Sequence, residues 1–209
     1  MTALRKTRIV PPTDAAPFAI RAERASDVGA REALLDACFG ATRSLRTCQR
    51  LRDGRAPAEG LAFSAVRQGK LVGTVRLWHV SAGGVPALVL GPLAVDNTCR
   101  KLGVGAALMD HALAAAKARG HRAVILLGDA PYYARFGFSA LKTGELSLPG
   151  PFERDRLLGL ELHKGALDGA WGMIVPEPRF DSIETERVLM PKTKAALSKK
   201  ALRAVPRAA

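Results

Sequence analysis

The chain has 209 residues, of which 48% are hydrophobic and 24% are charged, a composition typical of a globular protein. It contains no apolar run long enough to cross a membrane, which argues against an integral membrane protein. Its three cysteines lack the spacing of a metal site or a disulfide framework, so we expect a cytoplasmic protein in a reducing compartment.

The net charge of +13 is concentrated near the two ends of the chain. We predict a disordered basic arm at 1–17, one domain at 18–190 and a disordered basic tail at 191–209. The tail holds six cations and no acid, a charge that attracts nucleic acid or an acidic partner. It has no aromatic side chain on which bases would stack, so a nucleic-acid-associated protein is an alternative rather than the expected function.

The first part of the domain predicts a strand at 18–23 and a helix at 28–38, capped by Ser26 or Asp27. A second short helix is expected at 44–52. Three arginines at spacings of three and four would share one of its faces. That face is either solvated or a cationic wall beside a ligand, and the residues concerned are Arg43, Arg46 and Arg50.

The next part predicts an antiparallel meander of three strands, at 61–67, 70–80 and 85–95. Gln68 and Gly69 form the first hairpin turn, and 81–84 form the second.

The second half of the domain predicts a crossover from the meander to a parallel strand. A helix begins at Val104 and ends before Gly120, and a continuous apolar run follows at 123–127. Further predicted elements are a short helix opened by 128–131, a core strand beginning at Phe138, and strands at 157–163 and 171–175. The fold class is therefore α/β with a mixed sheet, first antiparallel and then parallel, flanked by helices.

The start of the predicted long helix has the features of an anion site. Arg100 and Lys101 precede Gly103 and Gly105, and the first turn carries no carboxylate. Free backbone N–H groups, glycines that allow close approach and two cations suit a phosphate. A dinucleotide-binding unit is disfavoured, because Leu108 stands where its third glycine would be.

Two ordered blocks resemble the GNAT superfamily of acyl-CoA N-acyltransferases, in particular a bacterial branch of predicted acetyltransferases. The first is Arg100-x-x-Gly103-x-Gly105, which follows a strand similar to the central strand of that family at 90–96. The second is the run from Tyr132 to Phe138, with a tyrosine four residues before a Gly-Phe pair. The resemblance covers about 18–140.

The resemblance implies acetyl-CoA as cosubstrate, no metal, and direct transfer of the acetyl group to an amine in a ternary complex. The acceptor would be a small-molecule or peptide amine, and neither its identity nor the oligomeric state follows from the sequence. Backbone amides near the end of the central strand would hold the pantetheine arm and polarise the thioester, and the turn into the helix would cradle the pyrophosphate. The residues concerned are Leu93, Ala94, Val95, Arg100, Lys101, Leu102, Gly103, Val104, Gly105 and Ala106.

By the same resemblance, Tyr133 would be the general acid for the leaving thiolate, while Tyr132 is structural. Asp129 stands where many relatives carry an asparagine that contacts pantetheine, and a carboxylate can only accept hydrogen bonds. The general base is left open among four residues, Glu23, Glu59, His79 and Asp96. A catalytically silent, CoA-binding or regulatory module of the same shape is the alternative function.

Overall fold

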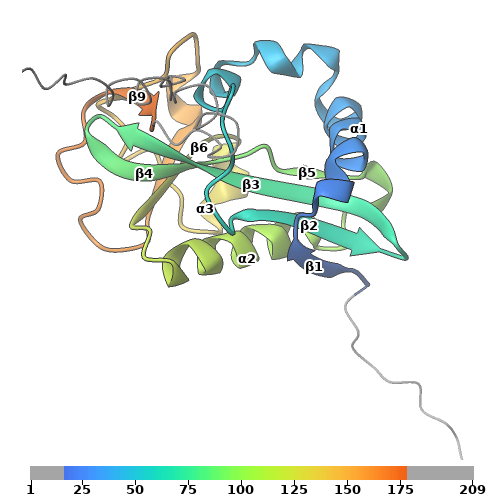
Figure 1. The fold of residues 1–209 in the computed structure, drawn as a ribbon. Helices are drawn as coiled ribbons and strands as arrows, with labels where there is room; N and C mark the ends of the chain where they lie inside the picture. The colour runs from blue at the N-terminus through green and yellow to red at the C-terminus, as the bar shows by residue number, and fades with distance from the viewer. Residues whose placement is uncertain (1–16, 178–209) are drawn as a thin grey trace, which may run out of the picture. The chain divides into compact units, whose positions relative to one another are not determined.

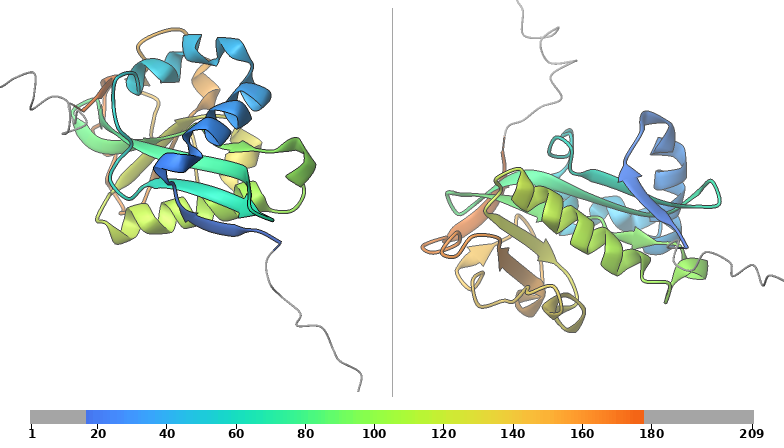
Figure 2. Two further views of the ribbon diagram at one scale, coloured as in Figure 1. Left: turned by 45° about the vertical axis from the view of Figure 1, so that its right-hand side comes forward. Right: turned by 90° about the horizontal axis from the view of Figure 1, so that it is seen from below.

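In a computed structural model of the chain, the structure describes residues 17–177 (Figure 1). The predicted tail at 191–209, almost all of the predicted basic arm, and the last part of the predicted domain, 178–190, lie outside the described residues. Within 17–177 the chain forms a mixed sheet flanked by helices, as the sequence predicts (Figures 1 and 2).

The sheet begins as an antiparallel meander and then gains parallel pairing, also as predicted. Its strands pair in the order β1-β2-β3-β4-β6-β8, with β5 and β9 on β3 and β7 on β9. Along that order only β4 and β6 are parallel. The described strands are β1 (Ala19–Ala22), β2 (Ala62–Arg67), β3 (Lys70–Ala82), β4 (Val85–Leu90), β5 (Ala94–Val95), β6 (Ala123–Leu127), β7 (Leu146–Ser147), β8 (Leu157–Glu161) and β9 (Gly172–Pro176).

Three α-helices and five short 3-10 helices connect these strands within the described part of the chain. The α-helices are α1 (Val28–Phe39), α2 (Val104–Ala118) and α3 (Ala130–Ala134). The 3-10 helices are η1 (Ala25–Asp27), η2 (Ala41–Leu45), η3 (Thr47–Leu51), η4 (Asn97–Cys99) and η5 (Arg154–Arg156).

Helices α1 and α2 lie on opposite faces of the sheet (Figures 1 and 2). The buried positions of α2 follow one stripe of the helix, namely Val104, Leu108, Met109, Ala112 and Ala116. Gly73 of β3 allows the close approach of α2, because a Cβ there would lie 2.9 Å from both Leu108 Cδ1 and Val104 Cγ1. The first turn of α2 is thereby fixed against the middle of the sheet.

Buried ion pairs attach α1 to the strands beneath it. The Glu23 carboxylate accepts hydrogen bonds from both Arg31 of α1 and Arg76 of β3. The predicted cap Asp27 makes no capping bond to α1. It accepts two hydrogen bonds from Arg21, at 2.6 and 2.8 Å, and this partner holds the pKa of the Asp27 carboxyl well below its usual range.

The predicted strand at 85–95 is in fact two strands separated by a β-bulge. The Gly91 N–H donates to Arg76 O at 2.8 Å, whereas Ala94 pairs with Thr74. From Gly91 to Ala94 the chain advances by three residues, whereas their partners on β3, Arg76 and Thr74, are two residues apart. The segment therefore contains one extra residue, which makes it a β-bulge. The Gly91–Pro92 peptide bond, within this bulge, is cis.

Two further predicted elements differ from the structure. The segment 44–52 is not one helix, because the backbone is extended at Arg46 (ψ 144°) and separates η2 from η3. Phe138 does not begin a core strand, and only an isolated bridge joins Ser139 to Gly159. A strand beginning at Phe138 would need the edge of β6, but β8 occupies that edge and pairs with β6 along its whole length.

Candidate active site

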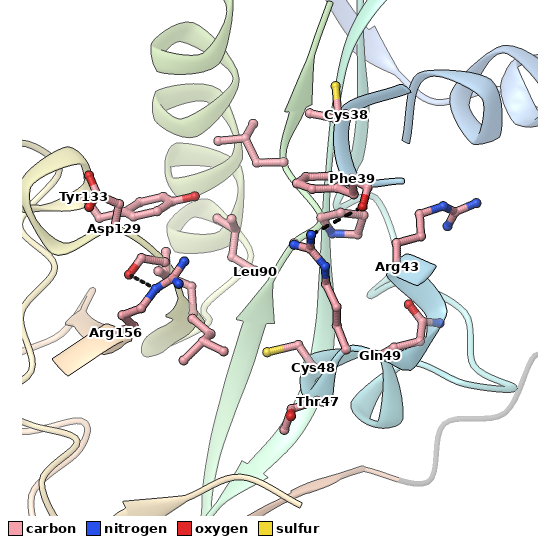
Figure 3. Close-up of a pocket in the computed structure, with 18 of the residues that line it drawn as sticks. Cys38, Phe39, Arg43, Thr47, Cys48, Gln49, Leu90, Asp129, Tyr133 and Arg156 are labelled. Atoms are coloured by element: carbon pink, nitrogen blue, oxygen red, sulfur yellow. Dashed lines mark hydrogen bonds between the residues drawn. The ribbon is translucent and has the colours of Figure 1, made fainter. Parts of the chain in front are cut away.

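A pocket of about 760 Å³ opens where β4 and β6 separate. The parallel strands β4 and β6 pair only at Leu88–Val124 and Val89–Ile125, after which the bulge carries the chain away from β6. One wall of the pocket is therefore the segment from Leu90 to Val95, and the opposite wall is the end of β6 with α3. The helices η2 and η3 and the segment 151–153 complete it (Figure 3).

The bulge leaves backbone N–H groups unpaired at the pocket wall. The Asp96 N–H donates to Val72 O of β3. Because N–H groups alternate in direction along a strand, the N–H of Ala94 also points toward β3, and the N–H of Val95 points away from it. Within 17–177, the Leu93 N–H has no backbone partner either. Leu93, Ala94 and Val95 all line the pocket, but the strand geometry leaves the amides of Leu93 and Val95 free for a ligand.

The N-terminus of α2 supplies a second group of free amides. Gly103 adopts a left-handed conformation (φ +77°) and its carbonyl accepts the first helical bond, from Ala107. In the described part of the chain, Val104, Gly105 and Ala106 therefore keep N–H groups without a backbone partner. Gly105 lines the pocket, and a Cβ there would lie 3.0 Å from the Tyr132 hydroxyl.

The other members of the predicted phosphate turn are placed less directly. Arg100 lines the pocket, whereas Lys101, Leu102, Gly103, Val104 and Ala106 are not among its lining residues. The amides of Arg100 and Leu102 are used inside the turn, where they donate to Asn97 O and Cys99 O at 3.4 and 3.3 Å.

Tyr133 stands opposite the bulge, and its hydroxyl points into the pocket (Figure 3). Burial, with smaller contributions from Tyr132 and Asp129, raises the pKa of Tyr133 to about 12. The ring lies against Gly128, where a Cβ would be only 2.2 Å from Tyr133 Cε2. Gly128 is thus the residue that lets the tyrosine ring occupy this position.

Two neighbours of Tyr133 have structural tasks. The Asp129 carboxylate accepts the Tyr132 N–H at 3.3 Å and so caps α3. The Tyr132 ring packs under the Arg135 guanidinium, 4.1 Å from the ring centre.

None of the four predicted general bases lines the pocket. Glu23 is held by two arginines, and Asp96 binds the N–H and hydroxyl of Thr98, which lowers the pKa of its carboxyl. The His79 ring lies 5.3 Å from the His121 ring, and Glu59 is exposed elsewhere. The carboxylates that do line the pocket are Asp129 and Glu153.

The remaining wall is rich in arginine, and only part of it was predicted. Of the two alternatives left open for this face, Arg43 and Arg46 agree with the cationic wall because both line the pocket, but Arg50 turns away and donates to Pro149 O at 2.6 Å. Arg52 and Arg156 are pocket residues that the sequence analysis did not identify. The run of arginines at 43–52 could have indicated that Arg52 is a pocket residue, whereas no sequence pattern indicated Arg156.

Two further findings concern the described part of the chain as a whole. Residues 17–177 contain no group of three or more His, Cys, Asp or Glu side chains arranged to hold a metal ion. None of the helices found there has both the length and the apolar character that a membrane span requires.

The sequence shows which family the chain belongs to. The pattern of the Acetyltransferase (GNAT) family matches residues 30–138, more than half of the chain, and the chain belongs to this family. The resemblance inferred from the two ordered blocks is thereby confirmed.

Individual relatives agree with that assignment. The chain is 28% identical over 164 residues to an uncharacterized N-acetyltransferase, YhbS, of Escherichia coli K12, with 78% of this chain and 98% of the relative covered. A crystal structure of E. coli YhbS in complex with CoA has a TM-score of 0.69 at 27% identity and covers 80% of this chain and 94% of that one. A GNAT family acetyltransferase from Brucella melitensis, in complex with acetyl-CoA, shares the fold with a TM-score of 0.60 at 24% identity, over 78% of this chain and 98% of that one.

Proposed function

We propose that the protein is an acetyl-CoA-dependent N-acetyltransferase that transfers the acetyl group directly to an amine in a ternary complex. One observation carries the proposal: free backbone amides of the bulge, the free amide of Gly105 at the start of α2 and the half-buried Tyr133 all belong to residues that line the same pocket. The complexes of the structural relatives with CoA and acetyl-CoA support the choice of cosubstrate.

The residues present suit acetyl-CoA. The amides of Gly103 to Ala106, with the charges of Arg100 and Lys101, would bind the pyrophosphate at the positive end of α2. The Leu93 and Val95 amides would hold the pantetheine arm and the thioester carbonyl, and stabilise the negative charge that develops on its oxygen. The carbonyl side of Val95 is occupied, because it accepts a hydrogen bond from Cys38 Sγ at 3.5 Å.

Tyr133 acts on the leaving sulfur. With a pKa of about 12 its hydroxyl stays protonated at physiological pH, so the donor is always available. That pKa lies above the ordinary thiol value of about 8.5, so the phenol is the weaker acid of the two. Tyr133 therefore donates a hydrogen bond to the sulfur as the C–S bond breaks and the C–N bond is completed. The proton that the amine nitrogen loses is taken up by the departing thiolate, so that the products are the acetylated amine and the CoA thiol.

A catalytically silent CoA-binding module is the second candidate, and the absence of the four predicted bases from the pocket lining favours it. The two functions differ in turnover but share the cofactor site. Release of CoA in the presence of an amine separates them.

The test is calorimetric titration of the protein with acetyl-CoA, with Gly105→Glu as the variant. A carboxylate at Gly105 would face the phosphates at short range, which at an effective dielectric constant of ~20 weakens binding by about 100-fold or more. Gly29→Glu is the matched control, because Gly29 lies in the first turn of α1, outside the pocket, with nothing within 4 Å of its Cβ position. Absence of acetyl-CoA binding by the unmodified protein would overturn the proposal.

A further inference from the structure

One side of the pocket is lined by residues that the proposed acetyl-CoA site does not use. What we infer about this side rests on the proposed function. The amides of the bulge and of α2 bound one side of the pocket. A second side is built by the end of α1, by η2 and η3 with the residues that follow them, and by the segment 151–153, and it lies across the pocket from Tyr133 (Figure 3). We call the second side the acceptor wall, defined by Phe39, Arg43, Arg46, Arg52 and Phe152.

The arginines of the acceptor wall are not equally neutralised. Arg43 donates to both Glu32 and Asp36, so its charge is balanced within the protein. Within 17–177, the Arg46 side chain donates a 3.4 Å hydrogen bond to Phe39 O and lies over the Phe39 ring, 5.1 Å from its centre. For Arg46 and Arg52, no carboxylate of the described residues lies within 4.0 Å.

Arg52 is the more unusual of the two. Its Nε is buried and has no hydrogen-bond partner among the described residues. The adjacent acid, Asp53, accepts a hydrogen bond from Gln49 Nε2 at 2.7 Å instead. Burial lowers the pKa of the Arg52 guanidinium, as expected for a charge withdrawn from water without a counter-ion. A guanidinium held in this way at a pocket wall is ready to pair with an anion of a ligand.

The position of Arg52 indicates which ligand that is. Arg52 Nη1 lies 3.8 Å from the Cβ position of Gly91, at the start of the bulge. The bulge is where the thioester is proposed to lie, whereas the pyrophosphate is proposed to lie at the N-terminus of α2. The charge of Arg52 therefore belongs to the end of the pocket where the acetyl group is transferred.

We propose that the acceptor is a primary amine that also carries an anionic group, a carboxylate or a phosphate, which Arg52 binds with Arg46 beside it. The same cations lower the pKa of the bound amine, because a nearby positive charge disfavours the ammonium form. The neutral amine that must attack the thioester is thereby favoured without a dedicated base.

The experiment titrates the CoA complex of the full-length protein with matched pairs of amines in a calorimeter. β-Alanine is compared with β-alaninamide, and phosphoethanolamine with ethanolamine, so that each pair differs in the anionic group. The same four amines are then tested as acceptors, with chromatographic measurement of the CoA released from acetyl-CoA. We expect at least tenfold tighter binding of the anionic member of one pair, and the pair that shows it distinguishes carboxylate from phosphate.

Variants of Arg52 assign the preference to this residue. Arg52→Gln is expected to weaken binding of the anionic amine at least tenfold, with less than a twofold change for its neutral partner and for acetyl-CoA. Arg52→Lys keeps the charge and should retain part of the preference. Arg67→Gln removes the same charge at the end of β2, outside the pocket, and should leave the preference unchanged.

Three results would overturn the proposal. One is equal affinity for both members of each pair, or no binding of any of the four amines to a protein that does bind CoA. Another is an equal loss for charged and neutral amines in Arg52→Gln, which would make Arg52 structural. The third is a weakened acetyl-CoA affinity in that variant, which would assign Arg52 to the cofactor. Failure of the proposed function itself is distinguishable, because the unmodified protein would then bind no acetyl-CoA.

Discussion

The two sides of the pocket are made from different parts of the polypeptide. The side proposed to bind acetyl-CoA consists mainly of backbone N–H groups, freed by a bulge after β4 and by the start of α2. The acceptor wall consists of side chains from the segment 39–52 and from Phe152. A backbone site depends on chain geometry and tolerates many side chains, whereas a side-chain site changes with each substitution. One fold can therefore keep its cosubstrate while its acceptor changes.

Substitution of Tyr133 should lower the rate of acetyl transfer while leaving substrate binding unchanged, and we expect it to have the largest effect on rate. Tyr133→Phe removes the hydroxyl and keeps the ring, so we expect kcat to fall about 100-fold or more, within the usual range for loss of a positioned hydrogen-bond donor to a developing negative charge. Acetyl-CoA affinity, measured by calorimetry, should change less than twofold. Tyr132→Phe is the control and should retain most of the activity. An unchanged kcat in Tyr133→Phe would remove this residue from the mechanism.

A methyl group at Gly128 should have a smaller effect of the same kind. In Gly128→Ala the new Cβ would lie 2.2 Å from the Tyr133 ring, so the ring must move away from its place opposite the bulge. We expect kcat to fall about tenfold, with destabilisation of about 1–3 kcal/mol in urea unfolding. Gly144→Ala is the matched control, since nothing lies within 4 Å of its Cβ position. Full activity of Gly128→Ala would show that the exact ring position is unimportant.

The pH dependence of kcat should show that the Tyr133 hydroxyl stays protonated. The Tyr133 pKa is raised to about 12, so its proton is retained well above the ordinary tyrosine value near 10. We therefore expect kcat to show no decline between pH 8 and about 10, provided that circular dichroism shows the protein folded at each pH. A descending limb with a midpoint below 10 that disappears in Tyr133→Phe would contradict the raised pKa.

The backbone side of the pocket could largely be predicted from the sequence. Gly103 and Gly105 mark the turn into α2, and Gly91 with Pro92 marks an irregularity in the strand, because few other residues are compatible with such backbone geometry. What the sequence did not reveal was the direction of individual amides. That direction depends on the register against β3, which separates the free N–H of Val95 from the paired N–H of Ala94.

The acceptor wall was much harder to predict. Arg52 and Arg156 lie about a hundred positions apart in the sequence, and only folding brings them to one pocket. The face predicted for Arg43, Arg46 and Arg50 assumed a continuous helix, and the extended backbone at Arg46 turns Arg50 elsewhere. Glu23 lies away from the pocket for a similar reason, because its partners Arg31 and Arg76 are brought to it by folding. Asp96 is instead occupied by a local contact, with Thr98 two residues further along the chain.

The single long strand β3 holds the backbone wall of the pocket in place. β3 pairs with β4 before the bulge and with β5 after it, so both ends of the bulge are fixed in register against one strand. The helix η3 is joined separately to the segment 149–153, by the bonds from Thr47 Oγ1 to Pro151 O and from Arg50 to Pro149 O, both at 2.6 Å. Substitutions that remove these two bonds should therefore change the acceptor wall and leave the geometry of the bulge intact.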